Sequence, residues 1–207
     1  MCWVNPLSHM SETIPFEGEG TQFVVLRAAM ARFSAYGFKK TSMEDIANEA
    51  MVSRPTLYSY FKNKQAILRA VSEGINDAVL ANIAAALQAD APLEDRLIRA
   101  FRAWTAPFIS ILFGSQHGAE LIGAGSAIAA DISVNAREHF HRLLTKALRK
   151  AKRSEEIDLL SVGMSLEGAA DFLILSLNGL STGESDAATQ DQRVESLAKV
   201  FLSAVAK

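Results

Sequence analysis

Apolar residues recur at three- and four-residue spacing along most of the chain, and this helical period constrains the fold more than any other feature. In the first stretch that has it, the apolar positions are Phe23, Leu26, Met30 and Phe33. The helix that they predict ends near Gly37, a residue type common at helix ends. No stretch of any length alternates apolar and polar residues as a strand does, and no segment repeats. The sequence therefore predicts an all-α fold.

Further helices follow from the same spacing and from local end signals. We expect them over residues 42–50, 54–61, 63–87, 93–105, 107–113, 131–152 and 156–180, with a last helix after a loop at 181–189. Ser42, with Asp45 three residues later, resembles a capping box at the start of the second helix. Ser53 is the expected N-cap of the third helix, and Pro55 falls in its first turn. A Gly- and Ala-rich stretch at 118–130 predicts no clear element.

Residues 43–62 predict two helices joined by a short turn. Such helices cross closely only where a small residue lies at the contact, and Ala47 meets this need. Apolar or aromatic residues occupy the expected interior positions: Ile46, Ala50, Val52, Leu57 and Tyr60. The second helix then exposes Arg54, Thr56 and Ser59, and a helix of this size fits the major groove of DNA, which is about 12 Å wide. The segment is therefore a candidate helix-turn-helix.

Charge is distributed unevenly along the chain. The 207 residues carry 21 basic and 23 acidic side chains, a net charge of −2. Residues 21–70 hold eight basic and three acidic side chains (+5), whereas residues 1–20 sum to −3 and residues 71–207 to −4. A basic segment joined to an acidic remainder is typical of a nucleic-acid-binding module attached to another domain. Chance clustering on a solvated face is the alternative.

Three strings in this basic region resemble the TetR family of bacterial transcriptional regulators. They are TSMEDIA at 41–47, AMVS at 50–53 and TLYSYFKNK at 56–64, preceded by Phe33, Tyr36, Gly37 and Phe38 at the end of the first helix. The resemblance covers about residues 20–74, and beyond them only the helical layout and the total length are similar. It implies a disordered tail at 1–18, a three-helix helix-turn-helix domain at 19–70 and a helical effector-binding and dimerisation domain at 71–207. The implied function is that of a sequence-specific repressor that a small-molecule effector releases from a palindromic operator.

The resemblance also implies which side chains contact double-stranded DNA: Lys40, Thr41, Ser42, Ser53, Arg54, Pro55, Thr56, Tyr58, Tyr60 and Lys64. Ser42, Tyr60 and Lys64 match phosphate-contacting positions, which fix register without reading sequence. Arg54 is the expected guanine contact, because its guanidinium matches guanine O6 and N7. In the alternative, Tyr58 and Tyr60 pack into the core and Lys64 is a solvated helix residue.

One position departs from the family pattern, because Met51 stands where the family usually has glycine. The turn there tends to need a left-handed backbone, which costs a non-glycine residue about 1 kcal/mol or somewhat more. We therefore expect a strained Met51.

A single recognition helix binds DNA too weakly to regulate a promoter, so we expect a homodimer that spans half-sites about 34 Å apart. The resemblance places the dimer contacts on the last two long helices before the terminal one, at Phe140, Leu144, Leu148, Leu166, Leu173 and Leu177, with Phe172 and Leu175 on the same faces. Alternatively, these residues serve the core of their own chain.

An effector pocket is expected in the helical domain, because aromatic-rich helical cavities suit small apolar ligands. Its candidate residues are Phe101, Trp104, Phe108, His117 and Phe172. Gln116 and Asn178 are further polar candidates, and ordinary core or surface placement is the alternative for each polar group.

Other classes of function lack a matching constellation. The single cysteine, Cys2, excludes an intramolecular disulfide framework and a cysteine-clustered metal site. His139 and His141 are two residues apart on a helix and point to different faces, so they do not form a zinc pair. We expect no catalytic residues, metal or cofactor. Two alternatives stay open: a helical carrier or enzyme with a vestigial DNA-binding head, and a protein-interaction module.

The first twenty residues lack the basic start and the apolar run of a secretory signal. The most apolar stretches are either too short to span a membrane or carry charge. We therefore expect a soluble cytoplasmic protein.

Overall fold

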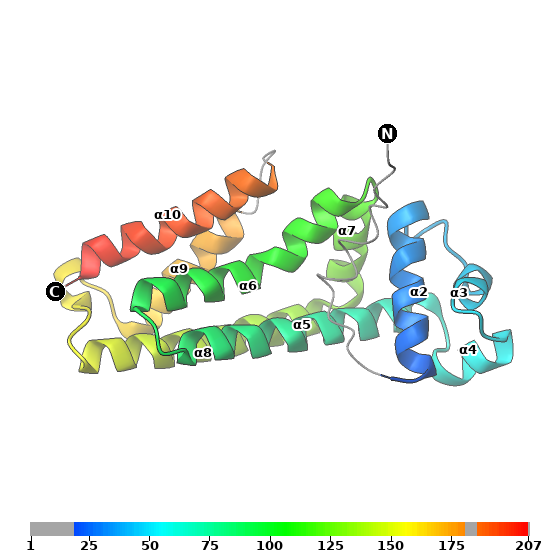
Figure 1. Ribbon diagram of the computed structural model, residues 1–207, viewed down its shortest axis with the longest axis horizontal. Coiled ribbons are helices and arrows are strands. Elements are labelled where there is room, and N and C mark those ends of the chain that lie inside the picture. The colour runs from blue at the N-terminus through cyan, green and yellow to red at the C-terminus, as the bar shows by residue number, and fades with distance from the viewer. Residues whose placement is uncertain (1–18, 181–185, 207) are drawn as a thin grey trace. The chain divides into compact units, whose positions relative to one another are not determined.

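The computed structural model describes residues 19–180 and 186–206, and their regular structure is helical (Figure 1). In chain order the elements are α2 (Thr21–Tyr36), α3 (Met43–Glu49), α4 (Arg54–Tyr60), α5 (Lys64–Gln88), α6 (Leu93–Gly114), α7 (Gly118–Ile128), α8 (Ala130–Arg153), the short 3₁₀ helix η1 (Leu159–Val162), α9 (Leu166–Leu180) and α10 (Ala187–Val205). Extended pairing in these residues is limited to one bridge, between Ile157 and Ala206. The all-α prediction is confirmed. The predicted tail at 1–18 and residues 181–185 of the predicted loop lie outside the described residues.

Two compact units alternate along the sequence. The first contains the described residues up to Ala78 together with Pro107–Ser133, and the second contains Val79–Ala106 with the described residues from Val134 on. The predicted domains at 19–70 and 71–207 are defined by expected function, whereas these units are defined by contacts within the chain. The domain boundaries therefore stay predictions.

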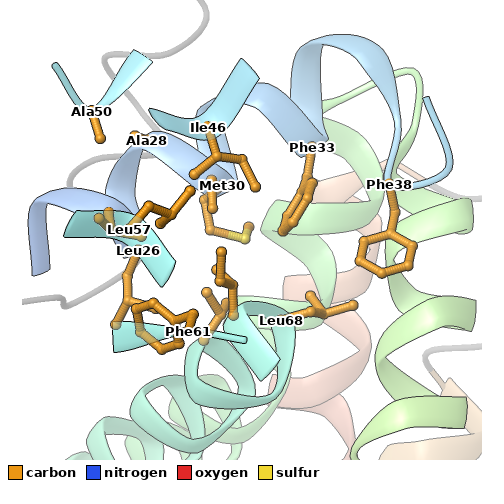
Figure 2. Packing of buried hydrophobic residues seen from close by; sticks show 14 of the residues in the cluster. Leu26, Ala28, Met30, Phe33, Phe38, Ile46, Ala50, Leu57, Phe61 and Leu68 are labelled. Carbon is orange, nitrogen blue, oxygen red and sulfur yellow. The ribbon is translucent and has the colours of Figure 1, made fainter. Parts of the chain in front are cut away.

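The core of the first unit joins α2, α3, α4, the start of α5 and α7. Leu57 of α4 and Ile46 of α3 have no exposed surface, and Leu121 of α7 is 4% exposed. Figure 2 shows the side chains of Met30, Ile46 and Leu57, from three different helices, in one cluster. Ala47 is 1% exposed, as the close crossing of the helix-turn-helix requires. This apolar cluster fixes α3 and α4 against α2.

The core of the second unit draws on α8 and α9. Five of the eight side chains predicted to meet a second copy have no exposed surface within the single chain: Phe140, Leu144, Leu148, Leu173 and Leu177. A side chain that its own chain covers completely cannot contact a partner, so this part of the dimer prediction is wrong. Helical periodicity identifies the apolar side of a helix but not what covers it. Of the other three, Leu166 is partly exposed, and Phe172 and Leu175 are exposed.

Two stretches differ from the predicted helix boundaries in the middle of the chain. α6 runs unbroken through Pro107, where the sequence predicts two helices. Proline removes a single backbone donor, and the helix continues on both sides of it. The stretch at 118–130, which predicts no clear element, contains α7.

α9 begins at Leu166 rather than near residue 156. Asp158 caps η1 by accepting a hydrogen bond from Leu160 N at 2.9 Å, and Gly163 ends η1 in a left-handed conformation with φ at 67°. Leu159 is buried within this connection. Its burial in a 3₁₀ turn accounts for apolar spacing that the prediction assigns to a longer α-helix.

Met51 adopts the expected left-handed backbone, with φ at 53°. Its side chain is 92% exposed, so packing does not offset the strain. Val52 donates its N–H to Ala47 O at 3.0 Å, which closes the turn between α3 and α4. The turn therefore keeps a helix-turn-helix geometry at a conformational cost in one residue.

We expect Met51→Gly to raise the free energy of unfolding by about 1 kcal/mol, because glycine adopts the left-handed backbone without strain. Urea denaturation measures this change. Met51→Ala is the matched control, since it removes the same exposed side chain, keeps the strain and should leave stability unchanged. A glycine variant no more stable than the alanine variant would contradict the assigned strain.

Candidate nucleic-acid interface

Two local caps hold the helices of the helix-turn-helix in place. Ser42 Oγ accepts a hydrogen bond from Asp45 N at 3.1 Å, and Asp45 Oδ2 accepts one from Ser42 N at 2.8 Å, which confirms the capping box. The hydrogen bonds from Ser42 lower the pKa of Asp45, because they stabilise its carboxylate. Ser53 caps α4 by accepting from Thr56 N at 3.2 Å, and Pro55 lies in the first turn. The predicted starts of α3 and α4 are confirmed.

α4 turns one side to the core and the other to solvent (Figure 1). Leu57 and Phe61 are buried and anchor the helix. The predicted contacts on its other side are exposed or, for Thr56, partly exposed: Arg54, Pro55, Thr56, Tyr58 and Tyr60. Tyr58 and Tyr60 expose 47% and 49% of their surfaces, so neither is a core residue, and the predicted interior position of Tyr60 is wrong. The exposed side of α4 is the candidate surface for reading bases.

The Arg54 guanidinium has an acidic neighbour in the DNA-free chain. Arg54 Nη1 lies 3.5 Å from Glu44 Oε2 on α3, and both side chains are more than half exposed. An exposed pair of this kind contributes little to stability, so it orients Arg54 without locking it. A base contact by Arg54 stays a prediction.

Side chains of the α2–α3 turn differ in accessibility. Lys40 and Ser42 are exposed, whereas Thr41 is 2% exposed. Thr41 Oγ1 donates to Gly37 O at 2.8 Å. Thr41 therefore stabilises the turn internally, and Lys40 and Ser42 are the members of this predicted group whose side chains a ligand can reach.

Lys64 has a structural role that the sequence did not reveal. Its Nζ donates to the carbonyl oxygens of Phe38 at 2.8 Å, Thr41 at 2.9 Å and Lys39 at 3.0 Å, and lies 4.8 Å from the centroid of the Phe38 ring. An ammonium group has three protons, so all of its donors are engaged. Lys64 therefore holds the α2–α3 turn together. A phosphate contact through its side chain stays a prediction, which these bonds disfavour.

The start of α7 supports the same turn from a distant part of the sequence. Glu120 Oε1 accepts from Lys39 N at 2.8 Å, and His117 Nδ1 lies 3.7 Å from Glu120 Oε2. Gly37 has φ at 85°, and a Cβ there would lie 2.5 Å from Glu120 Oε2 and 3.3 Å from His117 Nδ1. The backbone conformation therefore favours glycine, and any larger residue would also displace the Glu120 carboxylate. No sequence signal links Glu120 to Lys39, 81 residues away.

Another long-range contact in this unit joins α5 to the start of α8. Arg69 Nη1 lies 2.7 Å from Asp131 Oδ1, and Nη2 contacts Oδ2. The Arg69 guanidinium lowers the pKa of Asp131 to about 2. Because the folded pKa lies below the ordinary value, the stabilisation is present at neutral pH and is lost as the pH falls toward 2. The ion pair therefore persists under physiological conditions.

The predicted effector residues are divided between the two units. Phe108 and His117 belong to the first, and Phe101, Trp104 and Phe172 belong to the second. Phe101 has no exposed surface, and Phe172 is 44% exposed. Trp104 is partly buried and donates its Nε1–H to Asn178 Oδ1 at 3.2 Å. The effector pocket therefore stays a prediction. Trp104 and Asn178 are the two candidates for it that are hydrogen-bonded to each other.

Within residues 19–180 and 186–206, no helix is long and apolar enough to cross a bilayer. In the same residues, no group of three His, Cys, Asp or Glu side chains is placed to hold a metal ion. Cys2 lies outside the described part of the chain.

Residues 25–71 match the family described as "Bacterial regulatory proteins, tetR family". The HTH-type transcriptional regulator RutR of Escherichia coli (strain K12) is 42% identical over 69 residues, which cover 33% of this chain and 32% of RutR. The chain therefore aligns with about a third of the length of this curated relative. The family match over residues 25–71 contains α3, α4 and the turn between them.

Two solved structures share the fold over most of both chains. A transcriptional regulator from Cytophaga hutchinsonii ATCC 33406 has a TM-score of 0.75 at 19% identity, covering 91% of this chain and 100% of its own. The SmeT–triclosan complex has a TM-score of 0.67 at 18% identity, covering 91% and 93%. The likeness in fold thus extends well beyond the residues that are similar in sequence.

We expect Lys64→Met to lower the free energy of unfolding by about 2 kcal/mol, because hydrogen bonds from a charged donor contribute roughly 1.5–3 kcal/mol. Urea denaturation without DNA measures this loss. Lys62→Met is the matched control, since Lys62 is exposed two residues away and its loss should be neutral. Unchanged stability of the Lys64 variant, with weaker DNA binding, would assign Lys64 to phosphate contact instead.

Proposed function

We propose, from the premise that the N-terminal domain of this chain belongs to the TetR family of bacterial regulatory proteins, that the protein is a sequence-specific DNA-binding transcriptional regulator. The observation that carries the proposal is the geometry of α4. Buried Leu57 and Phe61 hold this helix in the core, and its opposite side presents Arg54 and Tyr58 to solvent. The surrounding residues 21–70 carry a net charge of +5, which favours a phosphate backbone.

The exposed side chains divide into two roles in this proposal. Arg54, Thr56 and Tyr58 reach base edges from α4, and Arg54 exchanges Glu44 for guanine. Phosphates are bound by polar side chains on either side of α4 and at its start: Lys40, Ser42, Ser53 and Tyr60. Pro55 has no donor and adds only apolar contact. Phosphate contacts fix the register on which base reading depends.

Control by a small molecule completes the proposal, with repression as the direction of regulation. SmeT, which shares the fold, is described in complex with triclosan. In the second unit of this chain Phe101 is buried, and the partly buried Trp104 donates a hydrogen bond to the exposed Asn178. An effector that binds one conformation more tightly shifts the population away from the DNA-binding form. A carrier or enzyme with a vestigial head would instead bind its ligand without any change in DNA affinity.

Dimerisation is part of the same proposal, with the contact surface limited to the exposed residues of α9. Gly168, Phe172, Leu175 and Gly179 recur at spacings of four, three and four residues. Phe172 and Leu175 are 44% and 56% exposed, and the glycines flank them as exposed small residues. Such spacing forms an apolar seam that packs against a like helix. We name these four residues the α9 seam and assign it to a second copy of the chain.

The base-reading role predicts a loss of sequence discrimination in Arg54→Ala. The operator for this test is a duplex that the wild-type protein selects from a random pool. The preference of Arg54→Ala for this operator over a scrambled duplex should be smaller than that of the wild type by about 1–3 kcal/mol. Lys40→Ala should weaken both duplexes equally and reduce the salt slope by about one. Arg99→Ala, which removes an exposed cation of the second unit, is the control. Failure to select any duplex at low salt would overturn the proposed function.

The α9 seam predicts that Leu175→Glu converts a dimer into a monomer, because it would bury an unpaired charge at the contact. Sedimentation velocity measures the change. Val200→Glu is the control, since Val200 is an exposed apolar residue of α10 outside the seam, at 66% exposure. A Leu175→Glu protein that stays dimeric would assign the dimer contact to another surface.

A further inference from the structure

The outer side of α8 carries a cluster of positive charge, although residues 71–207 as a whole have a net negative charge. Residues 142–153 contain six basic side chains and no acidic ones, within a segment whose total is −4. Arg142, Lys146, Arg149 and Arg153 follow one another at four- and three-residue spacing, so they lie along one side of the helix. At 1.5 Å per residue this row is about 16 Å long.

This row borders a groove of about 770 Å³ in the second unit. Its basic lining residues are Arg142, Lys146, Arg149, Lys150 and Arg153, and its lining contains one carboxylate, that of Glu167. Arg149 Nη2 lies 3.6 Å from Glu167 Oε1. The other four cations form no ion pair with any described residue. The groove therefore holds more positive charge than its own carboxylate balances.

Thr145 lies in the same groove and supplies an independent sign of a missing partner. It is 8% exposed, and its Oγ1 forms no hydrogen bond. A buried hydroxyl without a partner is unfavourable, because it has lost its hydrogen bonds to water. An acceptor atom that enters the groove would satisfy this hydroxyl and be stabilised by the surrounding cations.

We propose that this groove binds a small molecule that carries phosphate or carboxylate groups. The ligand places one oxyanion against Thr145 Oγ1 and Arg149 and further anionic groups along Lys146 and Arg142. A small ligand fits better than a DNA backbone or a helix of another protein, because the groove, at about 770 Å³, has the size of a small-molecule site. The proposal concerns the second unit and does not depend on operator binding.

Isothermal titration of the full chain with pyrophosphate and, separately, with citrate at low salt tests the proposal. We expect saturable binding of at least one of them. Thr145→Val should weaken it about tenfold, whereas Thr145→Ser should retain it, since a hydrogen bond between a hydroxyl and an anion is lost only in the first. Glu167→Gln should tighten binding, because it frees Arg149 and removes the competing carboxylate. The two titrations also show whether phosphate or carboxylate is preferred.

Lys152→Gln is the matched control, since Lys152 is an exposed basic residue of α8 outside the groove lining. Its affinity should stay within about twofold of wild type, while Lys146→Gln should lose clearly more. Removal of an unpaired hydroxyl should not lower the melting temperature of Thr145→Val, so folding does not obscure the result. Absence of saturable heat with both anions, or equal losses in the Lys146 and Lys152 variants, would overturn the proposal. A changed oligomeric state in Thr145→Val with unchanged titration would also overturn it and assign the groove to a second copy.

Discussion

The burial of Leu57 and Phe61 is the constraint on which the rest of the candidate nucleic-acid interface depends. α4 has only seven residues, and a helix of that length has no stability of its own in water. Its structure comes from the apolar cluster beneath it, together with the Ser53 cap. The outward direction of Arg54 and Tyr58 is therefore a product of the core rather than of any property of these side chains.

Backbone polar groups impose the second constraint, at the turn between α2 and α3. Three carbonyl oxygens point toward one place there, and a cation with three donors, Lys64, meets all of them. The N–H of Lys39 in the same turn is bonded to Glu120. A loop whose donors and acceptors are met by long side chains holds one conformation without regular secondary structure.

Features that depend on neighbours in sequence were predictable, and those that depend on distant contacts were not. The caps at Ser42 and Ser53 follow from a few adjacent residues, and the left-handed Met51 follows from the family pattern of that turn; the structure has all three. The covered face of α8 and the role of Lys64 depend on which segments pack together, which apolar spacing and residue type leave open. Phe140 illustrates the difference, because its place in the apolar spacing of α8 suits a dimer contact and the core of its own chain equally well.

The bond between Glu120 and Lys39 has a consequence for how the molecule can be divided. Ser34, Gly37 and Lys39 all have neighbours in the stretch after residue 106: Ser115, His117 and Glu120. Leu121 from the same stretch fills part of the apolar cluster under α2 and α3. A fragment cut at residue 70 or 78 would thus lack a side of its own core and a partner for its loop. The helix-turn-helix region therefore does not form a complete folding unit by itself, although its family match over residues 25–71 is continuous in sequence.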